Sequence, residues 1–126
     1  MYLKKETEAT IQEACKKWFD IQYPKDRLKL IHVANEGKRL GQTGRNQKKA
    51  GLTAGVSDLI LFKARKGYNA LCIEMKTQSK QSKLSEKQKL WQSAIEEEGY
   101  KYVICRSLEE FINIVADYLD DRNYKK

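Results

Sequence analysis

Apolar residues recur with the spacing of an α-helix in three segments of the chain. Residues 6–22 place hydrophobic side chains at i, i+3, i+4 and i+7, and Pro24 blocks continuation of that helix. Two further helices are predicted over 85–98 and 107–119, because each segment opens with a serine followed three residues later by Gln or Glu. That spacing is a capping box, in which the two residues satisfy each other's free backbone N–H groups. The chain is therefore expected to contain three amphipathic helices.

Between these helices the pattern changes to the short apolar runs of β-strands. Strands are predicted over 28–34, 56–62 and 68–76, and a fourth over 100–106 lies between the last two helices. Gly67 indicates a tight hairpin between the second and third strands. The resulting order, α-β-β-β-α-β-α, predicts an α/β fold in which helices flank a small mixed sheet, because a helical crossover connects the last two strands.

Charged residues interrupt this pattern near the ends of two predicted strands. Glu74 and Lys76 lie two positions apart, about 6.6–7 Å along a strand, and therefore leave the same face of the sheet. Asp58 lies near the start of the preceding strand, which in an antiparallel hairpin is the neighbour of Glu74. The two carboxylates are therefore expected to converge. Each residue also has an ordinary interpretation, since E-x-K is a common solvated pair and Asp58 can simply begin a strand.

Two polar residues also occupy the apolar stripes of predicted helices. Glu8 lies three residues before Ile11 on the first stripe, and Gln88 falls on the stripe that includes Trp91. The helix dipole alone could account for Glu8, and the capping box alone for Gln88. Together with the strand residues, however, they group carboxylates, an amide and an ammonium around one place. Such a group binds a hard divalent cation, Mg²⁺ or Mn²⁺, and supports metal-dependent phosphodiester hydrolysis.

The composition predicts one globular domain over residues 1–126 with a nucleic acid as its partner. The chain has 25 basic and 17 acidic residues, a net charge of +8 and a pI near 9.4. Residues 35–54 form a glycine-punctuated basic loop, and a loop of this length is more often functional than idle. Residues 108–121 carry five acids and no base, which indicates a separate face turned to water. A lysine-rich protein that is simply soluble is the alternative. The candidate contacts to a DNA backbone in the loop are Lys38, Arg39, Arg45, Lys48 and Lys49.

The cysteines and the lack of long apolar runs bear on where the protein acts. Cys15, Cys72 and Cys105 are far apart and each lies in an apolar pattern, which indicates buried, reduced thiols rather than a disulfide framework or a zinc site. No run approaches the roughly 18–20 apolar residues of a membrane span, and the first residues lack the features of a signal peptide. The expected location is the cytoplasm, with no membrane partner.

Two stretches of the chain resemble a known nuclease signature. "AGLTAGVSDLILF" (50–62) and "CIEMK" (72–76) are similar to the G-x-x-D…E-x-K motif of the PD-(D/E)XK nuclease superfamily. Glu8, "ANEGKR" (34–39) and "LSEKQKLWQ" (84–92) sharpen this resemblance to the VRR-NUC family. The resemblance spans nearly the whole chain and implies a single-domain, restriction-endonuclease-like α-β-β-β-α-β core.

The resemblance also implies a role for each residue that matches the motif. Asp58, Glu74 and the main-chain carbonyl of Met75 would bind Mg²⁺ or Mn²⁺, and Glu8 would complete the site directly or through water. Lys76 would be the catalytic lysine. Gln88 would orient the groups around the metal or the scissile phosphate.

The resemblance further implies an activity and a setting. The family comprises small virus-type replication and repair nucleases; its standalone members are similar to phage or prophage proteins, and related compact nucleases act as homodimers on branched DNA. The expectation is a Mg²⁺- or Mn²⁺-dependent endonuclease that cleaves structured DNA, such as a Holliday junction, in a bacterial or phage-infected cell. The alternatives are a non-catalytic basic nucleic-acid-binding module and a protein whose loop docks an acidic partner. The intact set of Asp58, Glu74 and Lys76 favours the nuclease.

Overall fold

The computed structural model describes residues 7–34, 51–79 and 82–121, which form a mixed sheet with helices on both faces. The predicted order of helices and strands is confirmed, with one additional 3₁₀ helix, η1, before the first strand. The elements are α1 (Glu8–Gln22), η1 (Pro24–Lys29), β1 (Leu30–His32), β2 (Leu59–Leu61), β3 (Leu71–Met75), α3 (Glu86–Glu97), β4 (Lys101–Cys105) and α4 (Leu108–Leu119).

The first strand begins later than the apolar pattern predicts. Pro24 does end α1, but its fixed φ also suits the first position of a helix, and η1 follows immediately. Leu28, predicted to lie in the strand, is part of η1 and is 86% exposed. The strand is therefore limited to Leu30–His32.

The sheet has the strand order β1-β2-β3-β4. The β1–β2 and β2–β3 pairs are antiparallel, whereas β3 and β4 are parallel and are joined through α3. The predicted hairpin turn is present: Arg65 and Tyr68 exchange backbone hydrogen bonds, and both Lys66 and Gly67 have positive φ angles of 52° and 83°. Two positive φ angles match the right-handed twist of a hairpin, and Gly adopts one without cost.

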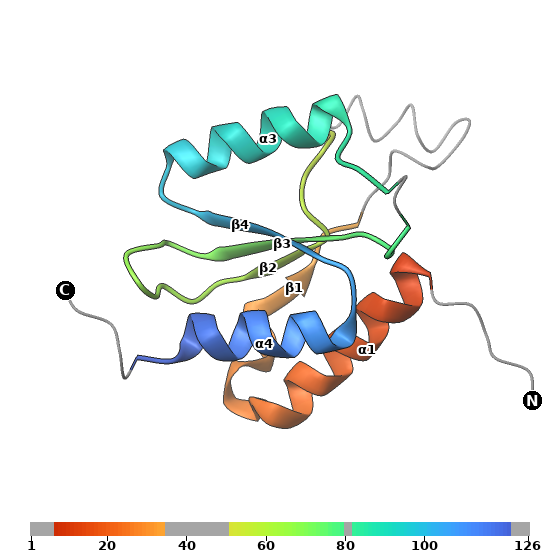
Figure 1. Ribbon diagram of the computed structural model, residues 1–126. Helices are drawn as coiled ribbons and strands as arrows, with labels where there is room; N and C mark the ends of the chain where they lie inside the picture. The colour runs from red at the N-terminus through yellow and green to blue at the C-terminus, as the bar shows by residue number, and fades with distance from the viewer. Residues whose placement is uncertain (1–6, 35–50, 80–81, 122–126) are drawn as a thin grey trace, which may run out of the picture.

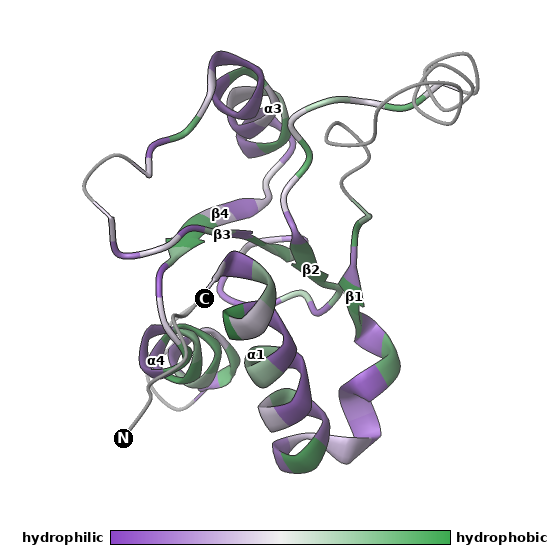
Figure 2. Ribbon diagram, turned by 90° about the vertical axis from the view of Figure 1, so that its right-hand side faces the viewer, coloured by the Kyte–Doolittle hydropathy of each residue, from purple (hydrophilic) through white to green (hydrophobic). Residues whose placement is uncertain are grey.

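The helices divide unequally between the two faces of the sheet. Figure 1 shows α3 on one face and α1 with α4 on the other. The hydrophobic residues of α4 line the side turned toward α1 and the sheet, and its hydrophilic residues line the outer side (Figure 2). The core lies on this face and is filled by Ile11, Cys15, Phe19, Leu30, Leu59, Leu61, Leu71, Ile73, Met75, Cys105, Phe111, Val115 and Tyr118.

The face beneath α3 has a different character, because side chains alternate along a strand. All five residues of β3 are buried; Leu71, Ile73 and Met75 join the core, so Cys72 and Glu74 point toward α3. No residue of α3 itself is fully buried. This thinner layer leaves room for polar side chains against the sheet.

The three cysteines lie in the interior, as their apolar surroundings predict. All three cysteines are buried and none is bridged to another. Within the residues that the structure describes, no helix is long and apolar enough to cross a membrane.

Candidate active site

Two carboxylates from neighbouring strands meet at the carboxyl-terminal end of β3. Leu59 pairs with Ile73 in the antiparallel ladder, so Asp58 lies opposite Glu74. The Asp58 Oδ2 atom accepts a hydrogen bond of 2.7 Å from the backbone N–H of Met75. This bond fixes the Asp58 carboxylate against the strand that carries Glu74. The structure thus brings together the two residues whose places at neighbouring strand ends predict that they converge.

The carboxylate of Glu74 is buried and only half satisfied. Its residue is 2% exposed, and its Oε2 atom accepts a hydrogen bond of 3.1 Å from Gln88 Nε2. Its Oε1 atom is buried and has no hydrogen-bond partner among the described residues. Only a protonated Glu74 can donate to Asp58; when both carboxyls are ionised, neither can satisfy the other. A buried anionic oxygen without a partner costs several kcal/mol, which a bound cation would offset.

The surroundings of Glu74 favour its protonated form. Burial, followed by the adjoining carboxyl of Asp58, raises the pKa of Glu74 from its ordinary value of 4.5 to about 9. The ammonium of Lys76 opposes this rise in the pKa, and the charge of Glu8 adds to it. The site therefore holds negative charge only at a cost, which is typical of positions that bind cations or move protons.

Gln88 links the N-terminus of α3 to Glu74 through the two ends of one amide. Its Oε1 atom accepts a hydrogen bond of 2.8 Å from the N–H of Ser85, and the Ser85 hydroxyl oxygen accepts one of 3.1 Å from the N–H of Gln88. This capping box determines which way the amide points, so Nε2 is turned toward Glu74. The capping function and the site contact are therefore compatible in the same side chain.

A tight turn before β2 brings Asp58 and α3 close together. Gly55 has a φ of +87°, and a Cβ atom there would lie 2.4 Å from the main-chain oxygen of Lys87. The loop thus packs directly against the backbone of the first turn of α3, next to Gln88. Only glycine combines this φ angle with so close an approach. The glycine in the G-x-x-D motif positions the site through packing rather than through chemistry.

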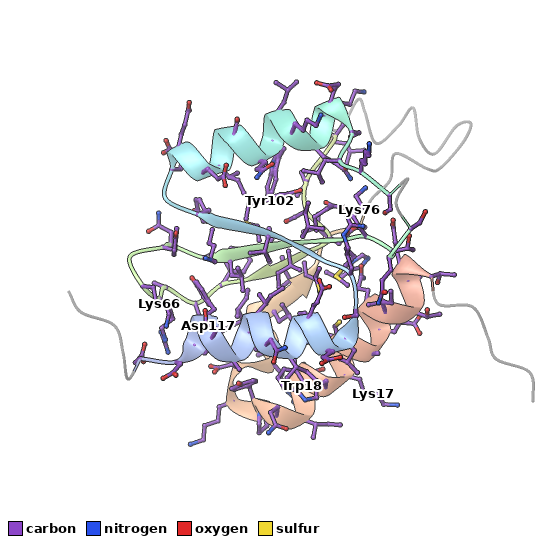
Figure 3. All side chains as sticks on the ribbon, viewed as in Figure 1. Lys17, Trp18, Lys66, Lys76, Tyr102 and Asp117 are labelled. Atoms are coloured by element: carbon purple, nitrogen blue, oxygen red, sulfur yellow. The ribbon has the colours of Figure 1, made fainter. Side chains whose placement is uncertain are left out.

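Glu8 and Lys76 approach the pair less closely than Gln88 does. Glu8 is the first residue of α1, which lies on the face of the sheet opposite α3 (Figure 1). Of the groups that change the pKa of Glu74, it has the smallest effect. Lys76 is half-buried immediately after β3, and its N–H donates to the Cys105 carbonyl at 3.0 Å. Figure 3 shows Lys76 at the end of the sheet where α1 and α3 begin.

The donor set fits a hard divalent cation, although it is sparse. Among the described residues, no group of three or more His, Cys, Asp or Glu side chains is placed to hold a metal ion. Asp58 and Glu74 contribute two carboxylates, and the unpartnered Oε1 of Glu74 is the oxygen that most needs a cation. All-oxygen ligation that leaves positions for water suits Mg²⁺ and Mn²⁺.

The structure also places two residues near the pair that sequence patterns do not single out. Tyr102 lies in β4 beneath Trp91 of α3 (ring centroids 6.1 Å apart), and its buried hydroxyl has no hydrogen-bond partner in the described part of the chain. Burial and the charges of Glu74 and Asp58 raise the pKa of that hydroxyl. His32 Nδ1 lies 3.2 Å from the Asp58 carbonyl oxygen. Neither residue is part of a sequence motif. Each lies near the pair only because its strand is next to β2 or β3 in the sheet.

The predicted DNA-contacting bases Lys38, Arg39, Arg45, Lys48 and Lys49 lie outside the described residues. The bases that the structure does describe near α3 are exposed, at Lys83, Lys87 and Lys89. They flank the end of the sheet that carries Asp58 and Glu74.

The stability of the metal-free protein is expected to fall as pH rises from about 4.5 to about 9. In that window folded Glu74 holds a proton that the unfolded chain has lost, since its folded pKa is about 9 against 4.5 unfolded. The expected slope is up to about 1.4 kcal/mol per pH unit. Urea unfolding in EDTA at pH 5, 6.5 and 8 measures it. The variant Glu74→Gln should lack this component, and an unchanged slope in the variant would contradict the assignment.

The comparisons with known proteins identify a domain family that the chain matches over most of its length. The model of the VRR-NUC domain family matches residues 6–109, which include every site residue described above. Among solved structures, one described as a VRR_NUC domain protein is 27% identical to this chain, with a TM-score of 0.76. The similarity covers 93% of this chain and 91% of that one. No curated protein matches the sequence. The resemblance that the sequence motifs predict is therefore confirmed.

Proposed function

This chain belongs to the VRR-NUC family of nucleases, and from that premise we propose that it is a Mg²⁺- or Mn²⁺-dependent deoxyribonuclease. It hydrolyses phosphodiester bonds within structured or branched DNA, as an endonuclease, in replication, repair or recombination. Residues 1–126 act as one nuclease domain, and a homodimer presents two active sites so that both strands of a junction can be cut.

The observation that carries this proposal is the pairing of half-buried Asp58 with buried Glu74, one of whose oxygens has no hydrogen-bond partner among the described residues. A surface that only binds DNA gains nothing from an acidic pair, because negative charge repels the phosphate backbone. Burying the Glu74 carboxylate next to Asp58 is also costly in the absence of a cation. The pair therefore supports a catalytic domain over a non-catalytic nucleic-acid-binding module.

The residues of the site can divide the work of hydrolysis among them. Asp58, Glu74 and the Met75 carbonyl would hold the divalent cation, which when bound polarises a phosphoryl oxygen and lowers the pKa of water. Gln88 keeps the Glu74 carboxylate in place through its hydrogen bond. Lys76 places a positive charge at the end of β3, where it stabilises negative charge developing on the phosphate. Glu8 adds negative potential from α1 and would contact the cation through water.

The DNA backbone would lie along the end of the sheet that carries the carboxylate pair. Lys83, Lys87 and Lys89 are exposed there, and each can neutralise a phosphate. The loop bases contribute the remaining contacts in this proposal: Lys38, Arg39, Arg45, Lys48 and Lys49.

The activity can be tested by nicking of fluorescent four-way junction, flap and linear duplex DNA with Mg²⁺, Mn²⁺ or EDTA. We expect cleavage only with a divalent cation, with the junction cut fastest, and a loss of about 10²-fold or more for Asp58→Asn. The matched control is Asp117→Asn, an exposed aspartate of α4 that Figure 3 shows well away from Lys76. Equal cleavage by wild type and Asp58→Asn with cation present would reject the proposal.

A further inference from the structure

The guanidinium group of Arg106 holds the main chain that follows the E-x-K motif. Arg106 is the first residue after β4, and its Nη1 atom donates a hydrogen bond of 2.6 Å to the carbonyl of Thr77. Its Nη2 atom donates one of 3.0 Å to the carbonyl of Ser82. One side chain thus ties together two points of the segment that connects β3 to α3. Both bonds are long-range, since they join residues 29 and 24 positions apart.

Arg106 is itself held in place at its backbone. Its N–H donates a hydrogen bond of 3.0 Å to Glu110 Oε1 on the first turn of α4. The residue before it, Cys105, is fully buried and accepts the N–H of Lys76 through its carbonyl. The guanidinium therefore projects from a fixed point of the sheet rather than from a loose loop.

Lys76 lies at a place where the sheet alone cannot fix it. The last residue pair of the β3–β4 ladder is Met75 with Cys105, so Lys76 comes just beyond the paired strand. The N–H of Lys76 donates to the Cys105 carbonyl. The next residue, Thr77, lies where the chain leaves the sheet. Strand ends open more readily than strand interiors. The bond from Arg106 to Thr77 restrains the chain at the first carbonyl after Lys76.

We propose that Arg106 is a positioning residue for Lys76. By bonding the carbonyls of Thr77 and Ser82, it keeps the exit of β3 in one conformation and fixes the main chain from which the Lys76 side chain extends toward the site. This inference rests on the proposed function, in which Lys76 stabilises charge on the phosphate. Misplacing such a group by about 1 Å can lower a rate by as much as 10²-fold.

The planar shape of the guanidinium matters more to this role than its charge. Arginine offers donors in a rigid fork and can bond two carbonyls at once, whereas lysine presents a single compact ammonium. A residue that only attracted DNA would be replaced without loss by lysine. The pair of variants Arg106→Lys and Arg106→Gln therefore separates the two roles.

The test combines kinetics with hydrogen exchange on the full chain. For both variants we expect kcat for DNA cleavage to fall about 10- to 100-fold, with KM and its salt dependence changed less than about threefold. Amide exchange at Lys76, whose N–H is bonded to the Cys105 carbonyl, should accelerate at least tenfold without metal or DNA. Arg65 provides the matched control, because its Nη1 donates to the Ala64 carbonyl at 2.8 Å in the hairpin at the other end of β3. Arg65→Lys and Arg65→Gln should change neither quantity.

Each alternative outcome overturns the proposal in a recognisable way. Wild-type kcat and exchange in Arg106→Lys would show that only the charge matters. A raised KM with unchanged kcat would indicate a DNA contact instead. If all exchange rates across the protein rise together, Arg106 supports the fold as a whole and not the exit of β3. Absence of cleavage by the wild type would reject the proposed function, whereas the exchange rates would still test the restraint by Arg106.

Discussion

Replacing Glu74 with Gln is expected to abolish DNA cleavage while making the metal-free protein more stable at pH 8. Cleavage should fall on the order of 10³-fold, because the variant lacks the charged Glu74 carboxylate. That carboxylate carries the unpartnered buried oxygen that we expect to bind the cation. Stability should rise by about 1–3 kcal/mol, because at pH 8 folded Glu74 must take up a proton that the unfolded chain has lost, whereas Gln is neutral in both states. A glutamine oxygen can still accept the bond from Gln88, and its amide can donate toward Asp58.

The opposite signs of these two effects make the prediction specific. Urea unfolding in EDTA at pH 8 measures the stability, and junction nicking with Mg²⁺ measures the activity. The matched control is Glu86→Gln, which removes the same charge from a side chain that is 87% exposed in the first turn of α3. It should alter cleavage less than about twofold and stability by less than about 0.5 kcal/mol. A less stable Glu74→Gln protein, or one that cleaves at the wild-type rate, would contradict our assignment of Glu74.

Replacing Gly55 with Ala is expected to destabilise the protein by about 3–4 kcal/mol. The positive φ accounts for about 1–2 kcal/mol, and the contact of the new Cβ with the main chain of Lys87 for the remainder. The contacted atoms belong to the backbone of α3, so no side chain can rotate away to relieve the clash. The loop and the helix must separate, which moves Asp58 relative to Gln88. Cleavage is therefore expected to fall at least about tenfold as well.

Gly51 provides a control in the same loop. Its φ of +94° resembles that of Gly55, but a Cβ atom there would have no neighbour within 4 Å among the described residues. Gly51→Ala should therefore cost only the conformational term, about 1–2 kcal/mol, and leave cleavage nearly unchanged. The difference between the two variants in thermal or urea unfolding isolates the packing of the loop against α3. Equal losses of stability in both variants would show that the close approach to Lys87 has no energetic weight.

Short-range patterns predicted most of the fold because their causes are local. The capping serines at 85 and 107 mark the starts of α3 and α4, and the hairpin turn at Gly67 follows from a positive φ that glycine tolerates. The η1 helix was missed because Pro24 both ends one helix and begins another, and an apolar Leu28 looks like strand in isolation. Whether Leu28 is exposed depends on which residues from other elements pack against it, and the local sequence does not specify them.

The sequence by itself determined which residues are candidates for the site and which two of them should lie near each other. The antiparallel order of the two strands is sufficient to bring Asp58 near Glu74, but the exact register does not follow from the turn. Arg65 pairs with Tyr68 whereas Leu61 pairs with Leu71, so the β2 side holds one extra residue between the turn and the ladder. Only the tertiary structure decided how buried Glu74 is, that Gln88 reaches it while Glu8 comes from the opposite face, and that Arg106 holds the carbonyl after Lys76. The physical reason is that burial, electrostatic potential and long-range hydrogen bonds depend on the packing of elements distant in sequence. The spacing of residues along one strand or helix carries no record of that packing.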